Sequence, residues 1–263
     1  MKKELQQSLK SLKVEYLDLY QFHNVSDKKT YDTILGANGA MEALQEARKA
    51  GEIRHIGISS HQIDIAKEAV KSDRFETIMY PTNFVANEAE DELLALARKH
   101  DVGVIAMKPL AGGRIINIKI AFKYLWQLAD VLMLPGMKTI REVEEIVQVL
   151  EKPGMTKADQ KEMQRLREEL SVRFCRHCEY CMPCPQGLVV AAVMDYEALL
   201  SGFIPERLYT GRFSDMFAQA TKCDECGECD EKCPYDIPVS SMVKEFTGKY
   251  HENKKKYEAG LLR

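Results

Sequence analysis

All eight cysteines of this 263-residue chain lie between Cys175 and Cys233, and the first 174 residues contain none. A small protein held together by disulfides would carry its cysteines along its whole length. A cysteine-free body followed by a cysteine-dense region predicts two domains instead, the second of which binds a metal centre.

The cysteines form two runs of four. The first run has two residues in each gap, ends beside Pro185, and consists of Cys175, Cys178, Cys181 and Cys184. The second run has gaps of two, two and three residues, ends beside Pro234, and consists of Cys223, Cys226, Cys229 and Cys233. The second spacing is that of bacterial ferredoxins. There, three thiolates hold one cluster and the fourth, beside a proline, holds the other.

Applied to both runs, this rule predicts two [4Fe–4S] clusters, each of which takes three cysteines from one run and its fourth from the other. One cluster takes Cys175, Cys178, Cys181 and Cys233, and the other takes Cys223, Cys226, Cys229 and Cys184. The first run departs from the bacterial pattern by having two residues, not three, before Cys184. Structural zinc is the alternative. Zinc is satisfied by Cys-x2-Cys pairs and does not call for three close cysteines plus Cys-Pro, twice.

Local charge differs between the two runs. The first run is flanked by Arg173, Arg176 and His177, whereas acidic residues crowd the second: Asp224, Glu225, Glu228, Asp230 and Glu231. Negative charge near a cluster disfavours addition of an electron. We therefore expect the cluster of Cys223, Cys226 and Cys229 to have the lower reduction potential. A solvated acidic loop without such an effect is the alternative.

The cysteine-free body alternates short apolar runs with helical stretches. The expected strands are Glu15–Phe22, Ile53–Ser59, Glu76–Tyr80, Val102–Met107 and Val131–Leu134. Strand and helix alternating in this way predict about five parallel βα units. A five-stranded doubly wound sheet has the same alternation. No Gly-x-Gly-x-x-Gly follows any strand, so a Rossmann fingerprint has no support.

Helix signals and composition divide the chain further. Asn87 before Glu88–His100 and Thr139 before Ile140–Lys152 are each followed three residues later by glutamate, which predicts N-caps. In the latter helix Ile140, Val143, Val147 and Leu150 share one face. The expected segments are a βα domain over residues 1–152, a linker helix over 153–173, a cluster domain over 174–248 and a basic tail over 249–263.

Composition excludes several function classes. Lys plus Arg total 37 and Asp plus Glu total 40, so a net charge of −3 gives no electrostatic case for binding nucleic acid or membrane surfaces. The longest apolar stretch, Leu188–Met194, is far too short to span a bilayer. The first residues lack the apolar segment of a signal peptide, and free cysteines favour a reducing cytoplasm.

Five strand-end motifs, together and in this order, resemble the aldo/keto reductase family. They are Asp18–His23, Gly57–Ser60, Met79–Asn83, Met107–Gly113 and Pro135–Thr139. The resemblance extends from about Lys2 to Lys152. With the cysteine region it is similar to the ferredoxin-fused branch of that family, for which Tyr180–Pro185 is typical. The apolar stretch Leu188–Leu200 and the segment Arg212–Ala220 suggest a mostly helical cluster domain, similar to the α-helical ferredoxins.

The family resemblance implies a (β/α)8 TIM-type barrel that moves hydride from NAD(P)H to a carbonyl. His23 matches the histidine that orients and polarises the carbonyl, and Ser59 and Asn83 match positions that hold the nicotinamide carboxamide. Lys108 matches a loop near the nicotinamide ribose and pyrophosphate. The positions that match the adenosine end are Lys138, Thr139 and Arg141, for the ribose or its 2′-phosphate, and Glu145, for the adenine. Met79 stands where the family commonly has glutamine.

One departure from the family concerns the proton donor. The family's tyrosine, with its supporting lysine and aspartate, comes from the first three βα units, and no residue here matches them. Tyr20 is no substitute, because strand alternation turns it away from His23. A full barrel needs about 250 residues, so this one is incomplete. Three explanations stay open: βα units encoded upstream, which we favour; a partner chain that supplies them; or a degenerate barrel used as a docking scaffold.

The sequence therefore favours an iron–sulfur oxidoreductase of aldo/keto reductase type. Its clusters would pass single electrons to or from a redox protein, ferredoxin-like or another carrier, and its substrate would be a small carbonyl compound. A non-catalytic electron-transfer module is the main alternative, and a zinc-bound interaction protein is a weaker one. No flavin motif is present to join two-electron hydride transfer to one-electron steps.

Overall fold

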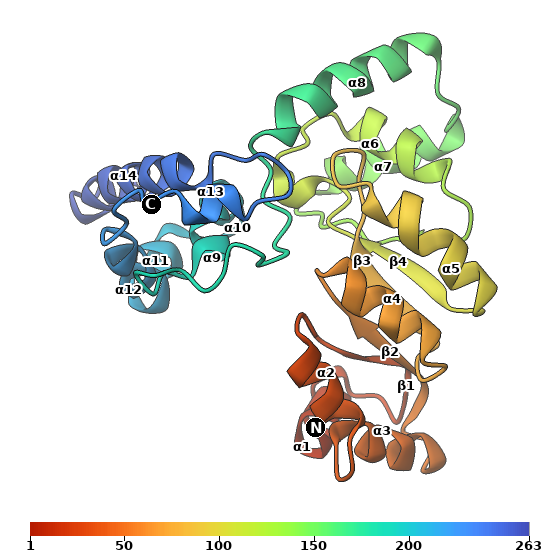
Figure 1. Cartoon of the computed structure of the whole chain (residues 1–263). Helices are drawn as coiled ribbons and strands as arrows, with labels where there is room; N and C mark the ends of the chain where they lie inside the picture. The colour runs from red at the N-terminus through yellow and green to blue at the C-terminus, as the bar shows by residue number, and fades with distance from the viewer. Residues whose placement is uncertain (263) are drawn as a thin grey trace. The chain divides into compact units, whose positions relative to one another are not determined.

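The computed structural model describes residues 1–262 and divides into two compact units (Figure 1). The first unit comprises Met1–Pro109 and Ile118–Met155. The second comprises Leu110–Asn117 and the chain from Thr156 onward. The loop 110–117 therefore leaves the first unit, contributes to the second, and returns.

The first unit is built on a five-stranded parallel sheet whose strands follow chain order. The strands are β1 (Leu17–Phe22), β2 (Ile53–Ser59), β3 (Thr77–Pro81), β4 (Gly103–Met107) and β5 (Val131–Met133). All five lie where the sequence predicts them, within two residues at each end. A doubly wound sheet would reverse its strand order at a switch point. Consecutive order with right-handed crossovers instead places the helices on one face, as in a section of a barrel wall.

One helix of the first unit precedes β1, and the others lie between or after the strands. They are α1 (Lys2–Leu12), α2 (Lys28–Leu35), α3 (Ala40–Lys49), α4 (Ile63–Lys71), η1 (Ala89–Leu93), α5 (Leu94–Lys99), α6 (Ile118–Trp126) and α7 (Ile140–Glu151). The predicted capping box of Thr139 and Glu142 is present at the start of α7. The cap predicted at Asn87 is wrong: the helix opens with the π-turn η1, and the amide of Glu90 binds the backbone carbonyl of Asn87.

The core of this unit lies between the sheet and its helices. Ile56, Ile58 and Ile78 from the sheet are fully buried with Leu44 of α3 and Ala66 of α4. Side chains alternate across each strand, so every second residue faces the opposite side.

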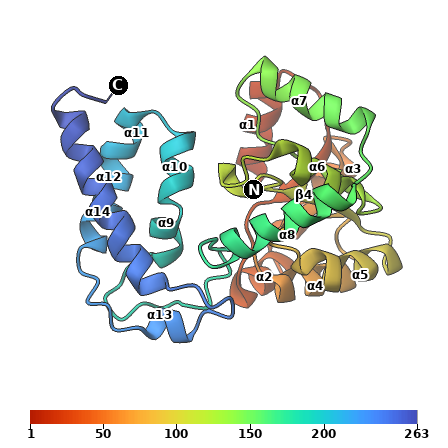
Figure 2. The same ribbon diagram turned by 90° about the horizontal axis from the view of Figure 1, so that it is seen from above.

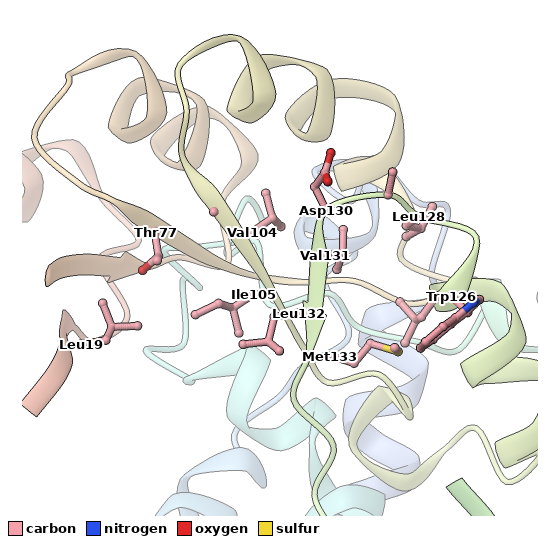
Figure 3. A pocket seen from close by; sticks show the side chains of 13 residues that line it. Leu19, Thr77, Val104, Ile105, Trp126, Leu128, Asp130, Val131, Leu132 and Met133 are labelled. Carbon is pink, nitrogen blue, oxygen red and sulfur yellow. The ribbon is translucent and has the colours of Figure 1, made fainter. Parts of the chain in front are cut away.

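That opposite face of the sheet is open. Figure 3 shows a surface hollow at β4 and β5 that is lined by Leu19, Val104, Val131, Leu132 and the buried Ile105. Leu132 is 63% exposed. A complete barrel would bury this face, because its interior is filled by side chains from all of its strands.

The second unit contains only helices among its described residues, as the sequence predicts. They are η2 (Ala111–Gly113), α8 (Lys157–Ser171), α9 (Val190–Met194), α10 (Tyr196–Gly202), α11 (Pro205–Tyr209), α12 (Gly211–Ala220), α13 (Glu228–Glu231) and α14 (Val239–Glu258). Figure 2 shows α9 to α12 beside α14, which contacts all four. The apolar stretch expected at Leu188–Leu200 is divided into α9 and α10 at Asp195.

The segment expected as a basic tail from residue 249 is mostly helical. It continues α14 to Glu258 because Tyr250 is fully buried there and stacks on Phe217 with ring centroids 4.0 Å apart. Arg263, the last residue of that expected tail, lies outside the described residues. Across the described chain, no helix is both long and apolar enough to cross a membrane.

Candidate functional site

The cysteine runs lie in loops whose backbone turns sharply. His177 and Glu179 in the first run have φ angles of 59° and 61°, and Glu225 and Gly227 in the second have 57° and 82°. A left-handed residue next to right-handed ones curls the chain into a concave loop. The left-handed residues therefore bend the backbone sharply within both runs.

One space gathers cysteines from both runs. Cys184 lines the same cavity as Cys223, Cys226 and Cys229, and a second first-run residue, Cys181, lines it too. The remaining walls of the cavity include the apolar side chains Leu188, Val190 and Val243. Cys184, the last cysteine of the first run, is thus placed among the first three cysteines of the second.

The pKa shifts of the first-run thiols concern the other predicted cluster, that of Cys175, Cys178, Cys181 and Cys233. Burial raises the pKa of Cys181 to about 12, and Cys175, Cys178 and the second-run residue Cys229 add to the rise. Burial also raises the pKa of Cys178, and Cys233 contributes to that rise from the second run. The four thiols predicted to share the other cluster thus interact electrostatically with one another, and Cys181 also interacts with Cys229 of the second run.

Most thiols of the two runs are partly buried. Burial raises the pKa of Cys175 and of Cys229 to about 11, so both are protonated at neutral pH until a metal displaces the proton. Cys175, Cys184 and Cys233 also pack against the apolar core of the second unit, and Cys226 is exposed. Among residues 1–262, no three His, Cys, Asp or Glu side chains are arranged to hold a single metal ion.

The acidic residues around the second run are paired. Glu225 bonds with Lys244, and Glu228 forms an ion pair with Lys232 at 2.9 Å. Asp230 accepts the backbone N–H of Ser240 at 2.8 Å. Lysines therefore offset some of the negative charge that the sequence places beside this run.

The candidate nucleotide residues lie at one edge of the sheet. His23, Ser59, Asn83, Lys108 and Lys138 follow or end β1 to β5 in order. The carboxyl ends of parallel strands share one edge, and that edge carries the active site in barrel enzymes. The structure thus brings together the five strand ends that the sequence singles out.

Two of these residues bind the backbone at that edge. Ser59 is 4% exposed, and its Oγ accepts the N–H of Asn24 at 2.8 Å. Asn83 is fully buried; its Oδ1 accepts the amides of Val85 and Ala86, and its Nδ2 donates to the carbonyl of Lys108 at 3.1 Å. Both side chains hold the strand-end loops in place.

Of the other candidates, His23, Lys138, Thr139 and Arg141 are exposed, whereas Lys108 and Glu145 are partly buried. His23 lines a surface hollow, and Lys138 and Arg141 lie at the start of α7. Arg141 pairs with Glu145 at 2.8 Å, while the carboxylate of Glu142 accepts the amides of Lys138 and Thr139. A helix N-terminus attracts anions, but a phosphate here would meet the carboxylates of Glu142 and Glu145.

Arg114 is the residue that sequence reasoning missed. It is 10% exposed, donates to the carbonyl of Met194 at 2.8 Å, and lies near the carboxylates of Asp195 (3.7 Å) and Glu197 (3.9 Å). Its guanidinium also lies over the ring of Phe174, 5.6 Å from the centroid. The only sequence signal is an arginine directly after a glycine pair, because its partners are 60 to 83 residues away.

Comparison with known proteins agrees with this two-domain organisation. Residues 1–117 match the sequence model of the aldo/keto reductase family, and residues 174–238 match that of the 4Fe-4S dicluster domain. The uncharacterized oxidoreductase YqkF of Bacillus subtilis is 34% identical over 113 residues, which are 43% of this chain and 35% of YqkF. Glyoxal reductase of the same organism is 27% identical over 132 residues, 49% of this chain and 45% of that protein. The chain thus spans less than half the length of either relative.

Solved structures share the fold of the first unit. The apo form of aldo-keto reductase AKR11C1 from Bacillus halodurans superposes with a TM-score of 0.52 at 23% identity, covering 63% of this chain and 67% of that one. An aldo/keto reductase from Klebsiella pneumoniae in complex with NADP and acetate gives a TM-score of 0.51 at 21% identity, covering 63% and 64%. The chain therefore carries a segment that matches the aldo/keto reductase family model and, after it, a segment that matches the 4Fe-4S dicluster model.

Proposed function

We propose that the chain is an NAD(P)H-linked oxidoreductase of the aldo/keto reductase type that uses two [4Fe–4S] clusters to exchange single electrons with a protein partner. The observation that carries the proposal is the position of Cys184 in one cavity with Cys223, Cys226 and Cys229. In two-cluster ferredoxins, each cluster takes its fourth cysteine ligand from the run that holds the other cluster. Free thiols at both runs favour a reducing cytoplasm.

In this proposal each domain of the chain has a distinct task. A bound nicotinamide nucleotide supplies or accepts hydride. Lys108 lies near its nicotinamide ribose and pyrophosphate, and Lys138, Thr139 and Arg141 take its adenosine ribose or 2′-phosphate. Glu145 contacts its adenine, and His23 orients and polarises a small carbonyl group. Ser59 and Asn83 hold the loops that surround the nicotinamide. The eight cysteines hold the clusters, and the exposed Cys226 gives the second cluster its approach to a redox protein.

A non-catalytic electron-transfer module is the second candidate. It is favoured by the bonds that engage Ser59 and Asn83, since both side chains already bind backbone groups of the strand-end loops. No tyrosine proton donor is assigned within residues 1–262. A separate polypeptide that carries the donor would restore the enzyme, whereas a carrier needs none.

Anaerobic reconstitution tests the cluster assignment. The wild-type chain is expected to bind about eight iron atoms and to give two distinct signals in electron paramagnetic resonance on reduction. Cys184→Ser should perturb the signal of the Cys223 cluster, and Cys233→Ser should perturb the other. If each variant instead affects the cluster of its own run, the assignment of each fourth ligand to the opposite run is wrong.

Nucleotide binding separates the two candidate functions. Quenching of NADPH or NADH fluorescence by the reconstituted chain, weakened by Lys108→Ala, supports the oxidoreductase. A chain whose clusters reduce normally but which binds neither nucleotide is a carrier. Turnover of small aldehydes and ketones then identifies the substrate class.

A further inference from the structure

The loop 110–117 connects the carboxyl edge of the sheet to the surroundings of the first cysteine run. Its residues follow β4 and Lys108 in sequence, but they pack in the second unit. Helix α10 contacts the short helix η2 of this loop. Gly112 makes the approach possible: its φ is +68°, and a Cβ there would lie 3.3 Å from the side chain of Ala198.

Arg114 places a nearly buried positive charge beside that run. Its aromatic contact, Phe174, directly precedes Cys175 in the chain. Its acidic neighbour, Asp195, also lies 2.7 Å from Nε2 of His177, between Cys175 and Cys178. A change of charge on a cluster held by Cys175 therefore acts on Arg114 at short range and away from bulk water.

The chain just before loop 110–117 is held as well, in the first unit. The carbonyl of Lys108 accepts the side-chain amide of Asn83 at 3.1 Å, and Lys108 itself is left-handed with φ 54°. Arg114 follows Lys108 closely in the chain, so their Cα atoms lie within about 22 Å of each other. The short segment 109–113 thus joins the candidate nucleotide lysine to a charge sensor beside the cluster.

We propose that Arg114 couples the redox state of the Cys175 cluster to nucleotide binding at the Lys108 loop. This linkage rests on the nucleotide-binding function proposed above. One electron from a low-potential donor converts the oxidised cluster to its reduced form and adds one negative charge. The added charge strengthens its attraction for Arg114 and holds the loop more firmly. Binding a nucleotide to an ordered loop then costs less conformational entropy.

The linkage has a definite sign. Reduction of the cluster should tighten nucleotide binding, and the nucleotide should raise the potential of that cluster by the equivalent amount, since coupling is reciprocal. Simple repulsion between a more negative cluster and an anionic nucleotide would act in the opposite direction. The sign of the effect therefore distinguishes the loop mechanism from direct electrostatics.

Calorimetry with 2′-phospho-ADP-ribose and ADP-ribose tests this on the full, reconstituted chain. These ligands lack the nicotinamide and cannot exchange electrons, so affinity can be compared in oxidised and dithionite-reduced protein. The affinity of the ligand that binds is expected to rise about fivefold on reduction. In a redox titration, the reduction potential of the cluster that Cys175 helps to hold should be about 40 mV higher with ligand than without. This shift is the fivefold affinity ratio expressed as a potential for a one-electron couple.

Three variants distinguish coupling from a general structural defect. Arg114→Ala should abolish the affinity ratio or invert it, while Arg114→Lys, which keeps the charge, should retain some of it. Arg207→Ala is the matched control, because Arg207 also lies over a phenylalanine ring of the second unit, that of Phe203, but is exposed. Iron content, cluster spectra and hydrogen exchange of residues 110–117 are measured for each variant.

The outcomes separate the two proposals. Equal affinity in both redox states of the wild type, or an unchanged ratio in Arg114→Ala, would overturn the linkage and leave the proposed function in place. Absence of binding by either ligand in both states would overturn the proposed function and the linkage together. Slower exchange of residues 110–117 on reduction, lost in Arg114→Ala, supports the loop mechanism specifically.

Discussion

The side-chain amide of Asn83 donates to the main-chain carbonyl of Lys108 at 3.1 Å, so the loop after β3 holds the loop after β4. Because Asn83 is fully buried, Asn83→Ala should also remove the side-chain oxygen that accepts the amides of Val85 and Ala86. We expect a loss of about 2–4 kcal/mol in the free energy of unfolding. Urea unfolding followed by the fluorescence of Trp126, the single tryptophan, reports on this unit. The exposed Gln7→Ala on α1 is the control and should change stability by less than about 0.5 kcal/mol.

Packing of α14 predicts where the cluster unit is most sensitive. Tyr250 stacks on Phe217 and donates its hydroxyl to the carbonyl of Leu208 at 3.1 Å. Tyr250→Ala should cost about 3–5 kcal/mol through loss of the buried ring. Tyr250→Phe should cost about 1 kcal/mol through loss of the hydrogen bond alone. Thermal loss of cluster absorbance measures both, and equal effects of the two variants would contradict the packing argument.

Lys232 should tune cluster potential. It pairs with Glu228, and its charge interacts with the thiols of Cys181 and Cys226. Lys232→Gln is expected to lower the reduction potentials by on the order of tens of millivolts, because a nearby positive charge favours an added electron. Lys256→Gln, near the C-terminal end of α14, is the matched control and should leave both potentials unchanged. The same titration tests whether the Cys223 cluster has the lower potential.

Cluster assembly should depend on pH. After chelation of the iron, the thiol of Cys175 has a pKa raised by burial to about 11. At any pH below that value, the fraction of the reactive thiolate rises as pH rises. Reassembly from iron and sulfide should therefore be faster at about pH 9 than at about pH 7, as measured by absorbance. A rate independent of pH would show that thiol deprotonation does not limit assembly.

The open face of the sheet predicts self-association or adsorption of hydrophobic dyes. Leu132 and Trp126 are 63% and 50% exposed around the same hollow (Figure 3). Leu132→Gln should reduce dye binding and concentration-dependent sedimentation, because exposed apolar patches drive association. Ile204→Gln, which replaces an exposed isoleucine of the second unit, is the control and should have little effect.

The sequence predicted what depends on local pattern. Parallel strands such as Ile53–Ser59 follow from their apolar runs. The grouping of Cys184 with the second run stays a prediction, supported by the cavity that these cysteines line together. Contacts between distant residues could not be read in this way. Arg114 meets Asp195 across 81 positions.

Pattern alone also cannot say what lies opposite an apolar face. Ile140, Val143 and Val147 share a face of α7 as expected, yet they remain exposed, and it is Ile146 that is buried. Likewise, the lysine-rich end of the chain conceals a buried aromatic residue, Tyr250, which extends the final helix.

The excursion of residues 110–117 into the second unit means that the chain crosses between units three times, after Pro109, Asn117 and Met155. A single proteolytic cut in the stretch before α8 would leave residues 110–117 still attached to the first unit by both of their ends. A protein truncated at that stretch would keep residues 110–117 but lose the part of the second unit against which they pack. The two units therefore cannot be exchanged between proteins by a single joint in the chain. A recombinant protein that receives the cysteine-containing unit also needs residues 110–117.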